Sequence, residues 1–398
     1  MESNHIFKSF TISVIMNNIG FRIIHEDKES NARTGILKTR HGEVETPYFM
    51  AVATKGVGKF IGTDDYKEIA DGLICNALVL SLMPGTEIIK NFGTIHDFIK
   101  FDKPIFTDCG GFQMLRESFM NERSKEGIHF KSPFDGKKFV ITPEKMMKIE
   151  QDIGADAVMM LDDVAPYGSN KEQFESSLEN THQWAVLSKK YHTDNDQMLY
   201  GIVQGGFFAD LREKSAKFIN EMDFDGLAIG GVAIGETREE MYIAINASMP
   251  FLNKNKPKHL LGVGSPDDIV ECVALGLDTF DSIFPTQIAR HGALFTMNGK
   301  IDILKSVYSN DANPIEINCE CFTCKNYSRA YIRHLLKLND PSGKRYVTIH
   351  NLYFMQQFMK KIRESIKDGT FMEFKNNIIK MYRKNKDVKY NVGVNVRQ

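Results

Sequence analysis

Short apolar runs alternate with longer amphipathic stretches from residue 48 to residue 284. The runs end in Gly, Pro or polar clusters, as buried strands do, and the stretches carry apolar residues three and four apart, as helices do. The predicted strands are Tyr48–Val52, Ala77–Leu82, Ile105–Asp108, Ala157–Leu161, Leu199–Val203, Leu227–Ile229, His259–Val263 and Thr279–Phe284. The predicted helices include Pro143–Ile153, Lys171–Tyr191, Phe208–Glu221, Arg238–Ala247 and Pro266–Leu275.

Eight strands that alternate with helices indicate an α/β protein with a parallel sheet, and they fit a (β/α)8 TIM barrel. An open doubly wound sheet is the alternative. A barrel also predicts where function lies, because the loops that follow the strands meet at one rim. Polar residues and glycines follow six of the predicted strands, at Asp108-Cys-Gly-Gly-Phe112, Asp162-Asp163, Gln204-Gly-Gly206, Gly230-Gly231, Gly262-Val-Gly264 and Asp281.

One Gly-Gly pair is more often a tight turn than a binding loop. Six such strand ends together predict a rim at which backbone amides approach a flat ligand. The rim has no Ser-His-Asp order, P-loop, catalytic zinc helix or GxGxxG motif, so hydrolase, kinase and dinucleotide-binding functions lack support. Two aspartates suit cleavage at an anomeric carbon, where one attacks or stabilises an oxocarbenium-like centre and the other moves protons.

A cysteine cluster follows the predicted barrel. Cys319, Cys321 and Cys324 form a CxCxxC motif, and His350 comes after 25 intervening residues. Three thiolates and an imidazole are the Cys3His set of structural zinc sites, so we expect one structural Zn2+ per chain. Three buried thiols beside an unrelated His are the alternative. The other three of the six cysteines are scattered singly, which suits a reducing compartment.

Composition is ordinary for a soluble globular protein, with 42% hydrophobic and 25% charged residues in 398. The first residues carry no basic stretch or cleavage site of a signal peptide, and no run reaches transmembrane length, so we expect a cytoplasmic protein with no membrane partner. Charge is split unevenly: residues 319–398 hold 17 Lys and Arg against 6 Asp and Glu, whereas residues 1–318 hold 33 against 45. A basic region beside a zinc module favours nucleic acid, although a solvated basic surface is the plainer explanation.

Several motifs together resemble those of the tRNA-guanine transglycosylase family, of the bacterial type without C-terminal RNA-binding domains. They are Asp108-Cys-Gly-Gly-Phe-Gln113, Gly201-Ile-Val-Gln-Gly-Gly206, Ile229-Gly-Gly-Val-Ala-Ile-Gly-Glu236, Phe280-Asp-Ser-Ile-Phe-Pro-Thr-Gln-Ile-Ala-Arg290 and the cysteine cluster. The similarity runs from about Arg33 to Phe371. It implies an enzyme, a pentosyltransferase of queuosine biosynthesis, that exchanges guanine at the anticodon wobble position of tRNA for a 7-deazaguanine base.

The resemblance also implies roles for individual residues. Asp281 matches the nucleophile that attacks C1′ of the ribose, and Asp108 matches the general acid/base. Residues matched to the base pocket are Cys109, Phe112, Asp162, Gln204, Gly231, Val232 and Leu261. Val164 and Ile234 match positions that size the pocket around the 7-substituent, and a bulky Ile234 favours the small preQ1 over queuine.

Two further groups match contacts with tRNA and with a second subunit. Expected RNA contacts are Thr286, Gln287, Arg290, Lys325, Arg329 and Arg333. Tyr327, Tyr331 and His334 match an aromatic contact of a homodimer, although tyrosines at helical spacing also suit an ordinary core. The chain departs from the family pattern at Gln287, where an arginine is usual, and at Cys109, where a serine is usual and a thiol is a poorer donor.

The resulting division of the chain has four parts: an N-terminal extension with the first β elements at 1–30, the barrel at 31–310, a zinc-binding subdomain with a closing helix at 311–371, and a basic tail at 372–398. Two other functions are also consistent with the sequence. One is a non-catalytic RNA-binding partner subunit of such an enzyme, which the presence of both Asp108 and Asp281 disfavours. The other is insertion of 7-deazaguanine into DNA.

Overall fold

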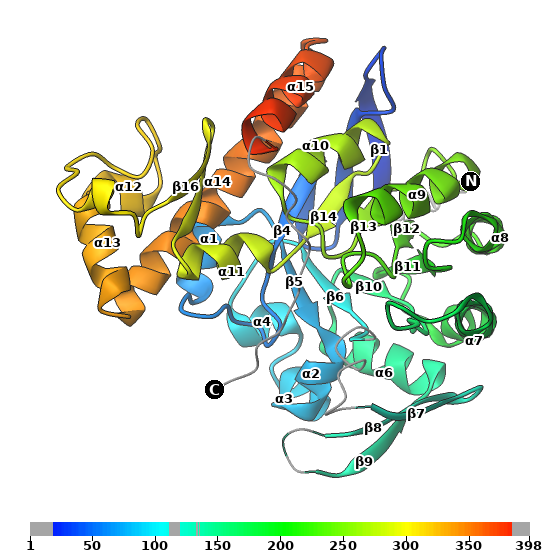
Figure 1. Cartoon of the computed structure of the whole chain (residues 1–398). Coiled ribbons are helices and arrows are strands. Elements are labelled where there is room, and N and C mark those ends of the chain that lie inside the picture. Colours follow the sequence, from blue (N-terminus) through cyan, green and yellow to red (C-terminus); the bar gives the residue numbers. More distant parts are fainter. Residues whose placement is uncertain (1–18, 111–119, 133, 135, 384–398) are drawn as a thin grey trace, which may run out of the picture.

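A closed parallel barrel forms the body of the protein. The computed structural model describes residues 19–110, 120–132, 134 and 136–383. The barrel strands follow one another in the order β10-β11-β12-β13-β14-β4-β5-β6 (Figure 1), which confirms the TIM barrel and rules out the open sheet. Their bounds are β4 Tyr48–Val52, β5 Leu73–Asn76, β6 Ile105–Asp108, β10 Ala157–Met159, β11 Met198–Val203, β12 Gly226–Ile229, β13 Lys258–Leu260 and β14 Thr279–Asp281.

The prediction of a strand at Ala77–Leu82 is wrong, because this segment is helix α2. Strand β5 precedes it and ends at Asn76, whose side chain accepts a hydrogen bond from the N–H of Val79 and so caps the helix. Residues 73–82 are apolar almost throughout, and most of them are buried in both elements. A run without a polar face has no period from which strand and helix can be distinguished.

The helices that cover the barrel begin and end near the predicted positions. Thr142 caps α6 through its side chain and Pro143 occupies the first turn, while Gly154 ends the helix with a φ of 71°. The covering helices are α6 Pro143–Ile153, α7 Lys171–Tyr191, α8 Ala209–Glu221, α9 Arg238–Ser248 and α10 Pro266–Ala274. The shorter helices around the β4, β5 and β6 connections are α1 Thr63–Ile69, α3 Thr86–Asn91 and α4 Ile95–Ile99.

Side chains from several strands fill the inside of the barrel. The rings of Phe106 and Tyr200 have centroids 5.4 Å apart, and the ring of His259 lies 6.4 Å from Phe106. All three residues are fully buried. The barrel is therefore a packed core, and a ligand can reach it only at the rim.

A three-stranded antiparallel sheet covers the pole at which the barrel strands begin. It consists of β1 (Gly20–Glu26), β2 (Arg33–Thr39) and β3 (Gly42–Thr46). Arg33 anchors it through a buried ion pair with Asp278, 2.6 Å long, just before β14. The sheet is thus tied to the barrel end that lies opposite the predicted site.

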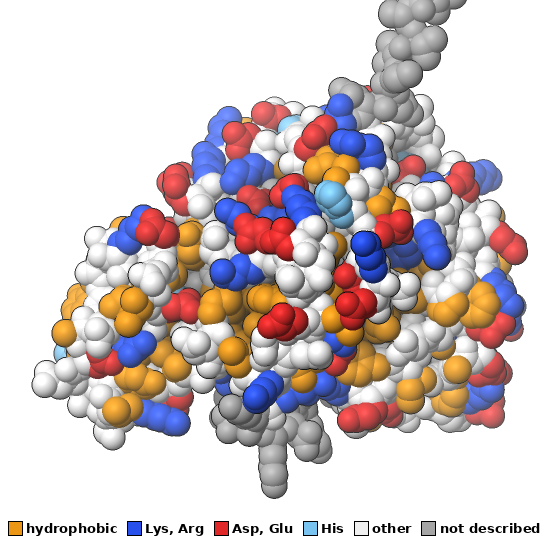
Figure 2. All heavy atoms as spheres, turned by 90° about the horizontal axis from the view of Figure 1, so that it is seen from above, with side chains coloured by type: hydrophobic (Ala, Val, Ile, Leu, Met, Phe, Trp, Pro, Cys, Tyr) orange, Lys and Arg blue, Asp and Glu red, His pale blue; other side chains and the backbone are white. Residues whose placement is uncertain are grey.

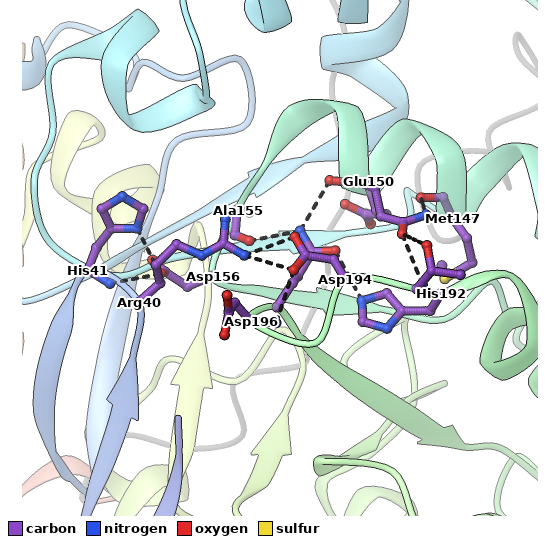
Figure 3. Close-up of polar contacts among 12 residues, drawn as sticks. Arg40, His41, Met147, Glu150, Ala155, Asp156, His192, Asp194 and Asp196 are labelled. Carbon is purple, nitrogen blue, oxygen red and sulfur yellow. Dashed lines mark hydrogen bonds and ion pairs between the residues drawn. The ribbon is translucent and has the colours of Figure 1, made fainter. Parts of the chain in front are cut away.

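Asp156 is the second anchor of this pole. One carboxylate oxygen lies 2.9 Å from Nδ1 of His41 and accepts the N–H of the same residue (Figure 3). The other oxygen lies 2.9 Å from Nε2 of His96 and accepts the N–H of Ile105. Burial alone would raise the pKa of Asp156, but the hydrogen bonds from the two histidines hold it well below its usual range.

Charges of both signs are mixed at this pole. Arg40 forms hydrogen bonds of 2.9 and 3.0 Å with Asp194 (Figure 3). On a different side of the molecule, the one uppermost in Figure 1 where α10 and α15 lie, Figure 2 also shows acidic and basic side chains intermingled. This arrangement differs from the field of one sign that a polyanion would select.

Two additions extend the barrel. An antiparallel sheet of β7 Met120–Ser124, β8 Gly127–Lys131 and β9 Lys138–Ile141 is inserted between β6 and α6. After β14 comes a C-terminal lobe, which Figure 1 shows beside the barrel, with α11 Phe284–Arg290, the hairpin β15 Ala293–Thr296 and β16 Gly299–Asp302, α12 Phe322–Asn326 and α13 Arg329–Lys337.

Helix α14 (Pro341–Lys367) joins this lobe to the barrel, where it packs against β4 and α11. Helix α15 (Phe371–Tyr382) follows and packs on α10, so ordered structure continues into the segment expected to be a basic tail. Within the described residues no helix is long and apolar enough to cross a membrane.

Candidate active site and metal centre

Two carboxylates meet at the rim where the barrel strands end. Asp108 is the last residue of β6 and Asp281 is the last residue of β14. The amide of Asn76 and the N–H of Gly110 donate to Oδ1 of Asp108, both at 2.7 Å. Burial raises the pKa of Asp108 to about 8, and the nearby negative charge of Asp281 adds to the rise.

Asp281 is held through one oxygen. Its Oδ1 lies 3.1 Å from Nε2 of His259 and 3.3 Å from the N–H of Gly262. The side chain is 14% exposed, so the carboxylate can be reached from the rim although its Oδ1 is held in place. An anchored carboxylate beside a carboxyl group with a raised pKa is the arrangement that a nucleophile and a proton carrier need.

A polar pair lies at the neighbouring strand ends. Nε2 of Gln204 donates to Oδ2 of Asp162 at 2.6 Å, and the thiol of Cys109 donates to Oδ1 at 3.4 Å. Burial raises the pKa of Asp162 to about 6, against the opposing effect of these two hydrogen bonds. The structure therefore brings together three of the predicted base-pocket residues, and the thiol at position 109 still reaches its carboxylate.

Position 231 has no room for a side chain, which explains its glycine. Its φ is +64°, and a Cβ there would lie 2.4 Å from Oε1 of Gln204. Val232 follows and is buried. The backbone at this strand end can thus approach a flat ligand closely, with Gln204 packed against it.

Two charged residues that the sequence did not single out support this segment. The buried guanidinium of Arg212 donates to the carbonyls of Gly206, Val203 and Gly230 at 2.7 to 2.9 Å, and burial lowers its pKa to about 9. Glu236 accepts the N–H groups of the loop 233–235. The sequence could have pointed to Arg212 only through the need of buried backbone carbonyls for a hydrogen-bond donor. Which carbonyls are buried is not known before the fold is known.

The remaining pocket predictions have different outcomes. Leu261 is partly buried against the main core, Val164 is buried, and Ile234 is partly exposed. The carbonyl of Val164 accepts a hydrogen bond of 2.6 Å from Arg123. Phe112 lies outside the described residues, so its predicted stacking on the base is untested.

The four predicted metal ligands converge in the C-terminal lobe. Ligand atoms of Cys319, Cys321, Cys324 and His350 all lie within 4.8 Å of one another, and Nδ1 of His350 is 3.4 to 3.8 Å from the three sulfurs. Nε2 of His350 lies 2.9 Å from the carbonyl of Phe295, which orients the ring. The cluster is mostly buried and has the donor set of a metal centre.

The predicted RNA contacts lie on α11 and in the C-terminal lobe. Thr286 and Gln287 are partly exposed, and Arg290 is half-buried near Tyr66, with its pKa lowered by burial. Lys325 is exposed and pairs with Glu320 at 2.8 Å. Of these groups, Lys325 has the side chain most open to solvent.

Arg329 and Arg333 have partners within the lobe. Arg329 pairs with Asp311 at 3.0 Å and donates to the carbonyl of Ile315, and Nε of Arg333 donates to the carbonyls of Leu304 and Lys305. Both arginines therefore hold the 304–315 segment. These contacts within the lobe give both arginines a structural role, which is an alternative to the predicted contact with RNA.

The three residues predicted for a subunit contact are close together. Tyr327 is partly buried, with its ring 4.5 Å from that of Tyr346, whereas Tyr331 is 44% exposed and His334 is exposed. The rings of Tyr327 and Tyr331 are 5.3 Å apart, and those of Tyr331 and His334 are 6.5 Å apart. Tyr327 is thus partly core, and Tyr331 and His334 form an outer aromatic surface.

A pair of carboxylates at the rim of a TIM barrel suits an enzyme that cleaves and re-forms a glycosidic bond, and comparison with known proteins identifies the class as ribosyltransferases. The family model described as queuine tRNA-ribosyltransferase matches residues 27–384. The chain is 44% identical over 369 residues to the queuine tRNA-ribosyltransferase of Thermoanaerobacter sp. (strain X514), with 92% of this chain and 98% of the relative covered. The enzymes of the same name from Desulforamulus reducens and Staphylococcus haemolyticus are 44% and 41% identical over 92% of this chain, with 99% and 97% of the relatives covered.

The chain belongs to the queuine tRNA-ribosyltransferase family. The resemblance to tRNA-guanine transglycosylases and the prediction of an enzyme are thereby confirmed.

Proposed function

We propose that this enzyme exchanges guanine at the anticodon wobble position of tRNA for a 7-deazaguanine base through a covalent bond between Asp281 and the ribose. The observation that carries the proposal is the pairing of the two rim carboxylates. Asp281 is held by one oxygen, and Asp108 has a pKa of about 8 beside it. No energy-carrying cofactor is needed, because one glycosidic bond replaces another.

In the first displacement, a carboxylate oxygen of Asp281 bonds to C1′ of the ribose while the bond from C1′ to N9 of guanine breaks. The electron pair stays on the departing base, which needs a proton. With a pKa of about 8, Asp108 is mostly protonated at neutral pH and can supply it.

In the second displacement, Asp108 works in the opposite direction. Formation of the ester removes the charge of Asp281, which is one of the causes that raise the pKa of Asp108. Asp108 has given its proton to the departing guanine, and the fall in its pKa once the intermediate exists keeps it ionised until it accepts the proton of the incoming base. That base then attacks C1′ and returns the electron pair to Asp281, and two inversions retain the configuration.

The pocket would read the base by its donor edge. Asp162 and Gln204 offer acceptors and an amide to an extruded purine, and the backbone at Gly231 and Val232 offers further polar contacts. Cys109 would hold the carboxylate of Asp162 in place. Leu261 and Phe112 would sandwich the ring.

Base choice would depend on the residues around the 7-substituent. Val164 is buried and Ile234 has a bulky branched side chain, so we propose preQ1 as the preferred base over queuine. A competition between the two bases for the purified enzyme tests this choice. Preferential incorporation of queuine would contradict it.

The Cys3His cluster would hold one zinc ion. Its donor set fits Zn2+, and a bound ion would fix the lobe by joining the residues 319–324 to helix α14. The basic residues of the lobe and of α11 would contact tRNA. Tyr331 and His334 would join two copies into a homodimer, in which one protomer reacts and the other helps to hold the RNA.

Exchange of labelled guanine tests the function as a whole. We expect label to enter tRNA that carries guanine at the wobble position and to stay out of duplex DNA. Incorporation into DNA would support the DNA-modifying alternative, and binding of tRNA without exchange would support the non-catalytic partner subunit. The expected cytoplasmic location stays a prediction.

A further inference from the structure

We infer that His259 is a positioning residue for Asp281 and decides which carboxylate oxygen attacks the ribose. The inference rests on the proposed function, in which Asp281 is the nucleophile. His259 is fully buried on β13, with Nε2 3.1 Å from Oδ1 of Asp281 and Nδ1 2.9 Å from Oγ1 of Thr279.

The strand register explains why the three side chains meet. His259 on β13 is paired with Thr279 on the adjacent parallel strand β14. Asp281 lies two residues beyond Thr279, and side chains two apart on a strand share a face. All three therefore point into the barrel, where the ring of His259 lies 6.4 Å from that of Phe106.

The two partners set the tautomer of His259. A carboxylate oxygen can only accept, so the proton lies on Nε2 and is donated to Asp281. In the neutral imidazole Nδ1 then has a lone pair, which can accept the hydroxyl proton of Thr279. A neutral imidazole in this tautomer satisfies both neighbours without a further buried charge.

The same contacts distinguish the two oxygens of Asp281. Oδ1 accepts hydrogen bonds from Nε2–H of His259 at 3.1 Å and from the N–H of Gly262 at 3.3 Å. Oδ2 has no hydrogen-bond partner among the residues that the structure describes. Oδ2 is thus the oxygen free to form the ester, and Oδ1 becomes its carbonyl oxygen.

This arrangement favours the second displacement. The N–H of His259 binds a charged carboxylate oxygen more strongly than the carbonyl oxygen of an ester. It therefore stabilises the departing carboxylate as the C1′ bond to Oδ2 breaks. Without this donor, the intermediate should break down more slowly, and the carboxylate should also lose its fixed orientation.

The test compares His259→Leu, which removes the donor, with His259→Gln, whose amide can reach the position of Nε2. Each variant is assayed for kcat and KM with tRNA and base, and for the fraction of enzyme bound covalently to tRNA when no base is added. His182→Leu serves as a control, because it removes a half-buried imidazole from α7, where it stacks on Phe218 at 4.1 Å. Asp281→Asn is measured in parallel.

We expect His259→Leu to lower kcat about 10- to 100-fold, the range for loss of one hydrogen bond to a charged group. KM should change less than about threefold, the covalent fraction should equal or exceed that of the wild type, and His259→Gln should recover most of kcat. A kcat of His259→Leu within about twofold of the wild type would overturn the inference. So would a covalent fraction that falls in step with kcat and is not restored by Gln, because that result indicates a merely structural role.

Two further readouts keep the test decisive. If His259→Leu does not fold, the comparison of His259→Gln with His259→Asn answers the same question, because the shorter Asn amide does not reach Asp281; equal activity of the two overturns the inference. If Asp281→Asn still forms the adduct, the proposed function fails. If Asp281→Asn is inactive while His259→Leu is unaffected, only the role of His259 fails.

Discussion

The side-chain amide of Asn76 donates a hydrogen bond of 2.7 Å to the carboxylate of Asp108. The oxygen of the same amide accepts the N–H of Val79 and caps helix α2. One residue at the end of β5 therefore fixes both the change from strand to helix and the orientation of the proposed proton carrier. The residue that caps helix α2 thus also orients Asp108.

The raised pKa of Asp108 predicts a pH-dependent cost in stability. The folded protein holds the proton up to about pH 8, whereas an unfolded Asp loses it near about pH 4, so stability falls as pH rises through this window. Asp108→Asn should therefore melt at a higher temperature than the wild type, and the gap should widen from pH 5 to pH 8. Calorimetric melting curves across this range measure the effect.

Glu175→Gln is the control for this comparison, because it also replaces a carboxylate by an amide but on the exposed face of α7. Its difference from the wild type should not grow with pH. A gap for Asp108→Asn that stays constant or narrows with rising pH would show that Asp108 is ionised in the folded protein throughout.

Loss of one thiolate should release the metal. We expect about one zinc per chain in the wild type and much less in Cys321→Ala, with the C-terminal lobe destabilised by several kcal/mol because metal binding and folding are coupled. Elemental analysis with protease sensitivity measures both. Cys272→Ala is the control, since it removes a buried thiol from α10 and should leave the zinc content unchanged. Unchanged zinc in Cys321→Ala would end the proposal.

The affinity for tRNA should fall steeply with salt, and Lys325 should contribute to the slope. Removing one lysine that neutralises a phosphate lowers the slope of log affinity against log salt by somewhat less than about one unit. Lys217→Ala is the matched control, because Lys217 is also exposed and paired with a glutamate, at 2.6 Å against 2.8 Å for Lys325. Equal slopes for wild type and Lys325→Ala would mean that the RNA lies elsewhere.

The outer aromatic surface should be needed for assembly. Tyr331 is 44% exposed, and aromatic side chains commonly anchor interfaces, so Tyr331→Ala should shift the mass at micromolar concentration from dimer towards monomer. Val186→Glu changes an apolar residue of similar exposure on α7 and should leave the mass unchanged. A wild-type monomer with undiminished tRNA exchange would contradict the homodimer.

The fold was largely predictable because alternation of buried strands with amphipathic helices is a local signal. Helices α6 and α7 have the predicted bounds, since Thr142 and Asn170 mark their first turns by side-chain caps. The signal failed at α2, where both β5 and the helix are apolar. It also gave no warning of the inserted β7–β9 sheet.

The site was predictable where function depends on motifs and was missed where it depends on packing. Asp108 and Asp281 lie at strand ends, and the spacing of the cysteines predicts the Cys3His cluster. His259 and Arg212 act through partners on other strands or through backbone carbonyls. Strand register brings His259 to its partners and the packing of α8 on the barrel brings Arg212 to its carbonyls, and neither can be read from one segment alone.

The identity of the attacking carboxylate is tested most directly by locating the covalent bond. Enzyme and tRNA are mixed without an incoming base, denatured, digested with nuclease and protease, and examined by mass spectrometry. We expect a ribose adduct on Asp281, no adduct in Asp281→Asn, and a loss of exchange in that variant of more than about a thousandfold, because an amide is a poor nucleophile. An adduct on Asp108 or Asp162, or full exchange by Asp281→Asn, would contradict it.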